Sequence, residues 1–123
     1  EAITNAAYTI SKNAQAKAII TFSVSGGTTL RMSKERAPVQ IVGISPNIKT
    51  SRKLQIAWGV NSCHALDAND TKEMVSIACT IVKDKKIASP GDSVVITAGI
   101  PFGSAGSTNL LRIAKIIADQ DLT

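Results

Sequence analysis

Short apolar runs alternate with segments of helical spacing along the whole chain, and few folds accommodate such an alternation. The apolar runs are residues 18–22, 39–44, 60–66 and 93–98. The segments with helical spacing are residues 2–14, 30–36, 50–58 and 70–81. Two neighbouring parallel strands need a long crossover, which is usually a helix. The alternation therefore predicts an α/β fold with right-handed crossovers, a mostly parallel sheet and helices on both faces.

The ends of these segments carry matching signals. Pro38 ends the second helix, because the residue before a proline is pushed out of the helical region, and Gly59 is typical of a helix stop. Asp70 and Glu73 have the spacing of a capping box. Residues 110–117 fit a strand or a short helix, and their recurring isoleucine, a β-branched residue, favours a closing strand.

Composition supports a single folded domain over residues 1–123. Hydrophobic residues make up 44% of the chain and aromatic residues only 3%, so the apolar mass is aliphatic. Such a mixture suits buried parallel strands covered by helices. We find no internal repeat or linker.

The net charge of +5 makes an anionic partner conceivable. The basic residues are scattered apart from clusters at 52–53 and 83–86, and neither cluster is interleaved with aromatic residues. The second cluster fits the solvated end of a helix. We therefore expect no nucleic-acid partner.

No apolar run approaches the length needed to cross a bilayer, and the first residues do not resemble a signal peptide. The cysteines, Cys63 and Cys79, do not form a disulfide framework. We expect a reduced, cytoplasmic protein with no membrane partner.

The loop after the first apolar run, at residues 23–29, is rich in glycine and hydroxyl side chains. Glycines allow a close backbone approach, and the amides of a following helix point outward, so the loop suits an anion such as phosphate. The alternative is that Thr28 is an ordinary helix cap and that Gly26 and Gly27 only make a tight turn.

A second loop of small residues, 103–108, follows the fourth apolar run, and we expect it at the same edge of the sheet. It lacks the Gly-Lys-Ser/Thr ending of a nucleotide P-loop, so nucleotide hydrolysis is not supported. No Gly-x-Gly-x-x-Gly follows a strand, which argues against a dinucleotide site.

No catalytic or metal-binding constellation is predicted. His64 is the only histidine, and its neighbour Cys63 would point to the opposite face of a strand. The carboxylates within residues 67–73 are explained by helix capping. Trp58, on the apolar face of its helix, is expected in the core or in an interface.

Several blocks of the chain resemble the C-terminal domain of pyruvate kinase, in order and in spacing. They are residues 18–20, 25–28, 33–38, 58–60, 91–101 and 106–109. The last of them, Gly106-Ser107-Thr108-Asn109, is close to the Gly-Thr-Thr-Asn of that family.

The resemblance implies a three-layer α/β/α sandwich with a five-stranded mixed sheet, order 3-2-1-4-5 and an antiparallel last strand. In the full-length enzyme a separate catalytic barrel transfers phosphate from phosphoenolpyruvate to ADP with Mg²⁺ and K⁺. The C-terminal domain carries no cofactor and no chemistry. It binds an allosteric sugar phosphate or nucleotide and joins subunits into a homotetramer. We therefore expect a non-catalytic regulatory and oligomerisation domain.

The resemblance also implies which residues form the effector site. The effector phosphate would lie on Ser23, Ser25, Gly26, Gly27 and Thr28. The loop that closes over it would comprise Phe102, Gly103, Ser104, Ala105, Gly106 and Ser107.

Two departures from the family pattern bear on the effector. Many members carry Arg or Lys where Gly27 stands, and the segment 64–71 is shorter than in fructose-bisphosphate-activated enzymes. A sugar monophosphate, AMP or no effector therefore stay open. So do a free-standing phosphate-binding module and a purely structural subunit-interface domain.

Overall fold

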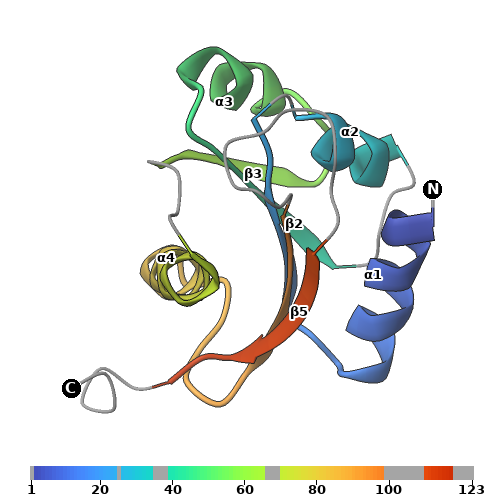
Figure 1. The fold of residues 1–123 in the computed structure, drawn as a ribbon, viewed down its shortest axis with the longest axis vertical. Coiled ribbons are helices and arrows are strands. Elements are labelled where there is room, and N and C mark those ends of the chain that lie inside the picture. The colour runs from blue at the N-terminus through green and yellow to red at the C-terminus, as the bar shows by residue number, and fades with distance from the viewer. Residues whose placement is uncertain (1, 25, 35–38, 66–69, 99–109, 118–123) are drawn as a thin grey trace.

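Five strands pair into one sheet in the computed structural model, which describes residues 2–24, 26–34, 39–65, 70–98 and 110–117. The strands are β1 (Ala18–Phe22), β2 (Gln40–Ser45), β3 (Val60–His64), β4 (Ser93–Ala98) and β5 (Leu110–Lys115). Their order is β3-β2-β1-β4-β5, and only β5 runs antiparallel to its neighbour among these pairs (Figure 1). The predicted sheet order and the closing strand are confirmed.

Helices cover both faces of this sheet, as Figure 1 shows. They are α1 (Ala2–Asn13), α2 (Gly27–Lys34), α3 (Ile48–Leu54) and α4 (Thr71–Asp84). Fully buried side chains of α4 pack with Ile20 and Ile96 on one face, and those of α1 and α2 pack with Ile19 and Val95 on the other. Because strand side chains alternate between faces, these two sets define two separate cores and a three-layer sandwich.

The beginning of α4 forms as predicted. Oδ1 of Asp70 accepts a hydrogen bond from the backbone amide of Glu73 at 2.8 Å. Met74, four residues after Asp70, begins a fully buried stripe that Ala78 and Val82 continue. The cap satisfies an amide that the helix leaves unpaired, and the stripe anchors α4 on the sheet.

The helix predicted over 50–58 lies earlier in the chain, and this prediction is wrong in its bounds. Asn47 caps α3, since its Oδ1 accepts from the amides of Lys49 at 2.9 Å and Thr50 at 3.3 Å. The helix ends at Leu54, so Trp58 follows it in a turn and is 51% exposed. Trp58 is therefore not in the core.

The second helix also differs from its predicted range of 30–36. It begins three residues earlier, at Gly27, and the described part ends at Lys34. The helix thus starts within the glycine-rich segment itself. This earlier start places the first turn of α2 directly after the end of β1.

Candidate functional site

The carboxyl ends of β1 and β4 lie side by side at the middle of the sheet. In the parallel pairing of these strands Thr21 is opposite Thr97. From this point the chain leaves β1 toward β2 and leaves β4 toward β5, in opposite directions across the sheet (Figure 1). In open α/β sheets ligands bind where neighbouring strand ends lead apart in this way.

A tight turn follows β1. Oγ of Ser23 accepts a hydrogen bond from the amide of Gly26 at 2.7 Å. Gly26 has a φ of +85°, which favours glycine, and a Cβ there would lie 3.1 Å from Cγ2 of Thr50 and 3.3 Å from Cδ2 of Leu54. Both the backbone conformation and the neighbouring α3 therefore require glycine at this position.

The middle of this turn is held by groups that the sequence did not reveal. Oγ1 of Thr50, in α3, donates to the carbonyl of Val24 at 2.8 Å, and Oγ of Ser45, at the end of β2, donates to the same carbonyl at 3.4 Å. Val24 is thus held by two other elements. A backbone group held in this way loses little conformational freedom when a ligand binds.

The first turn of α2 continues from this loop. Gly27 is exposed, whereas Thr28 and Thr29 are buried, and Oγ1 of Thr29 lies 2.6 Å from Oγ1 of Thr21. This first turn carries no acidic side chain, and the basic residues of α2 lie in its last turn. The partial positive charge of the helix start is therefore not offset by a carboxylate of its own.

The structure brings together some of the predicted effector residues. Ser23, Gly26, Gly27 and Thr28 lie on one short stretch between β1 and α2. Ser25 and the predicted closing loop lie outside the described residues. The residues of that closing loop are Phe102, Gly103, Ser104, Ala105, Gly106 and Ser107.

Cys63 and His64 do not form a pair. Cys63 packs against the core beneath α4, whereas His64 is exposed and its Nε2 lies 3.0 Å from the carbonyl oxygen of Pro46. Within the described part of the chain no three His, Cys, Asp or Glu side chains gather to hold a metal ion. None of the described helices is long and apolar enough to cross a membrane.

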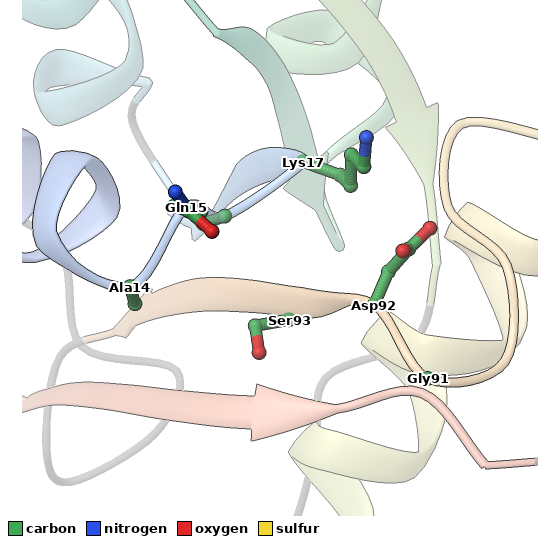
Figure 2. Close-up of a pocket in the computed structure, with 7 residues that line it drawn as sticks. Ala14, Gln15, Lys17, Gly91, Asp92 and Ser93 are labelled. Atoms are coloured by element: carbon green, nitrogen blue, oxygen red, sulfur yellow. The ribbon is translucent and has the colours of Figure 1, made fainter.

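An open hollow lies at the opposite end of the sheet, where β1 and β4 begin (Figure 2). Two polar groups of its lining are already engaged in the fold. Oδ2 of Asp92 accepts from the amide of Ser89 at 2.8 Å, and the amide of Lys17 donates to the carbonyl of Ser93 at 2.9 Å. The exposed side chains of Gln15 and Lys17 also line the hollow, and two exposed side chains alone do not define a ligand site.

Comparison with known proteins decides which family these features belong to. A family model described as "Pyruvate kinase, alpha/beta domain" matches residues 1–114. The chain belongs to the pyruvate kinase alpha/beta domain family. The resemblance found in the sequence blocks is thereby confirmed.

The chain is similar to whole pyruvate kinases over a part of their length. It is 36% identical over 120 residues to the enzyme of Methylorubrum extorquens, covering 98% of this chain and 25% of that relative. It is 38% identical over 107 residues to the enzyme of Geobacillus stearothermophilus, covering 87% of this chain and 18% of that relative.

A solved structure has the same fold. The crystal structure of a pyruvate kinase from Cryptosporidium parvum superposes with a TM-score of 0.82 at 25% identity, over 94% of this chain and 22% of that one. The chain thus corresponds to about a quarter or less of these pyruvate kinases.

Proposed function

We propose that this chain is the regulatory and oligomerisation domain of a pyruvate kinase, which takes a phosphorylated effector at the β1–α2 loop. Phosphate transfer from phosphoenolpyruvate to ADP, with Mg²⁺ and K⁺, would belong to a catalytic barrel of the same enzyme. The effector would be a sugar monophosphate or AMP. In this proposal the domain binds the effector and transmits the effect of binding to the rest of the enzyme, and it carries out no chemical step.

The observation that carries the effector site is the way in which Val24 and Gly26 are held between β1 and α2. Gly26 has a positive φ that favours glycine, and α2 begins directly after it at Gly27. The side chains of Thr50 and Ser45 donate hydrogen bonds to the carbonyl of Val24. A helix start next to a glycine turn is a common phosphate site. Gly27 supplies no cation, which favours a small, weakly held ligand over a bisphosphate.

The effector site is tested by titrating the chain with AMP, a sugar monophosphate and inorganic phosphate in a calorimeter. The variant Thr28→Ala should weaken binding by about tenfold, because a hydrogen bond to a charged group is worth about 1.5–3 kcal/mol. Gly27→Arg should strengthen it by a similar factor, since Gly27 is exposed at the start of α2. Thr80→Ala, on an exposed position of α4, is the matched control.

These titrations also separate the proposal from its alternatives. Saturable binding by the chain would support a phosphate site. If none of the ligands binds and Gly27→Arg changes nothing, the effector proposal fails and a purely structural domain is favoured.

The oligomerisation role is supported by β5, which forms an edge of the sheet in the described part of the chain. This strand is last in the sheet order, and Ile113 is 49% exposed on it. Apolar side chains on an unpaired edge strand favour contact with another chain. The variant Ile113→Lys should shift the chain toward monomer in light scattering after size exclusion. If the original chain is already a monomer at high concentration, and Ile113→Lys has the same mass, a role of this edge is contradicted.

A further inference from the structure

The side-chain hydroxyl group of Thr97 is buried and has no hydrogen-bond partner among the described residues. The residue is only 1% exposed, and its Oγ1 is the buried side-chain oxygen for which the described part of the chain supplies no hydrogen-bond partner. Buried polar atoms in folded proteins are nearly always hydrogen-bonded, so an exception calls for a physical cause. The neighbourhood of Thr97 indicates one.

Thr97 ends a row of hydroxyl groups that begins at the proposed anion site. Thr29, in the first turn of α2, has its Oγ1 2.6 Å from Oγ1 of Thr21. Thr21 is paired in register with Thr97 on the neighbouring strand, so their side chains point to the same face of the sheet. We call Thr29, Thr21 and Thr97 the hydroxyl row.

The middle member and the last member of the hydroxyl row differ in their hydrogen bonding. Thr21 is within reach of both Thr29 and the carbonyl of Val42, the latter at 3.4 Å. Thr97 lacks such a partner among the described residues, although it stands one residue before the carboxyl end of β4. The unsatisfied oxygen thus lies near the edge of the sheet where β1 passes into α2.

We propose that Thr97 is a positioning residue of this anion site, and that its hydroxyl gains a hydrogen bond when phosphate occupies the β1–α2 loop. The partner is an oxygen of the anion or a water molecule that the anion orders. The inference rests on the proposed effector site. The unsatisfied hydroxyl raises the free energy of the ligand-free domain, and its satisfaction in the complex then favours binding.

The variant Thr97→Val tests this, because valine keeps the shape of threonine and removes the hydroxyl. The melting temperature of the 123-residue chain is measured with and without inorganic phosphate. Without phosphate, Thr97→Val should melt about 3–6 °C higher than the original chain, because an uncompensated buried polar group is removed. Its affinity for phosphate should fall about 3- to 10-fold, because a hydrogen bond of the complex is lost.

Three further variants separate this role from general effects on the core. Thr97→Ser retains a hydroxyl and should bind phosphate as the original chain does. Thr21→Val should lower the melting temperature without phosphate, because the Thr21 hydroxyl is already bonded to Thr29. Thr80→Val, at an exposed position on α4, should change neither quantity.

The outcomes distinguish failure of this inference from failure of the proposed function. If phosphate stabilises the original chain and Thr97→Val equally, the Thr97 hydroxyl takes no part in binding and the inference is overturned. A lower melting temperature of ligand-free Thr97→Val also overturns it, since the hydroxyl would then be satisfied without ligand, for example by a buried water. If phosphate does not affect the original chain, the anion site itself fails.

Discussion

The two faces of the central strands differ most at their carboxyl ends. Toward α4, the side chains of β1 and β4 stay apolar up to Phe22 and Ala98. Toward α2, the same strands change from Ile19 and Val95 to Thr21 and Thr97. The two faces of one sheet therefore have different roles. The α4 side supplies cohesion by aliphatic burial, and the α2 side gives up part of that cohesion to place hydroxyl groups beside a loop.

The strongest test of this division is a cavity on the α4 side. Met74 of α4 is fully buried in the cluster that contains Ile20 and Ile96. Met74→Ala should lower the free energy of unfolding by about 2–5 kcal/mol, because buried contacts are lost and a cavity remains. Urea denaturation measures this loss. Phosphate-induced stabilisation should survive in Met74→Ala, at a temperature where the variant is folded.

Ile56→Ala is the control for Met74→Ala, because Ile56 is 89% exposed. It should change the free energy of unfolding by less than about 0.5 kcal/mol. Equal losses in the two variants would contradict the assignment of cohesion to the α4 side.

A smaller effect is expected from Gly43 on the α2 side, where Gly43 is paired with Thr21. A Cβ there would lie 2.9 Å from Cγ2 of Thr29 and 3.2 Å from Cδ1 of Leu54. Gly43→Ala should lower the free energy of unfolding by about 1–3 kcal/mol through overpacking. It should also weaken phosphate binding, since the first turn of α2 must move. Calorimetric titration of the folded variant checks this.

Gly59→Ala is the matched control for Gly43→Ala. Gly59 has a φ of +70°, and a Cβ there would meet nothing within 4 Å. Its substitution should cost about 1–2 kcal/mol through the backbone alone and leave phosphate binding unchanged. If Gly43→Ala binds phosphate as Gly59→Ala does, the close packing above the hydroxyl row has no bearing on the site.

The sequence predicts the cohesive side of the molecule better than the polar side. The strands were recognisable because residues 18–22 and 93–98 are mostly apolar runs, which suit burial on both faces of a parallel sheet. The capping role of Asp70 was also visible, because a cap and the amide that it satisfies are neighbours in the sequence.

The errors and omissions arose where a local pattern competed with a contact elsewhere. The apolar spacing of Leu54 and Trp58 suggested a helix to 58, but the cap at Asn47 starts α3 early and the helix ends at Leu54. The clamp of Thr50 on Val24 joins residues 26 positions apart. The hydroxyl row depends on the register of β1 against β4, and no local pattern specifies which threonines such a register brings together.

The smallest effect concerns the α4 side again, through the thiol of Cys79. Burial raises the pKa of this thiol above its ordinary value of 9.0, and the nearby Lys83 opposes the shift. The thiol should therefore react more slowly with iodoacetamide at pH 8 than the same cysteine in the unfolded chain.

The raised pKa of Cys79 also makes stability depend on pH, because the unfolded chain releases the thiol proton first. The contribution of the protonated thiol to stability is fully present below the ordinary pKa and is lost as the pH rises through the higher folded value. The difference in unfolding free energy between the original chain and Cys79→Ala, followed from pH 8 upward by urea denaturation, should shrink above about pH 9. A difference that grows with pH would mean that the thiolate is stabilised in the fold, and that the outer margin of the α4 core is more polar than its aliphatic side chains indicate.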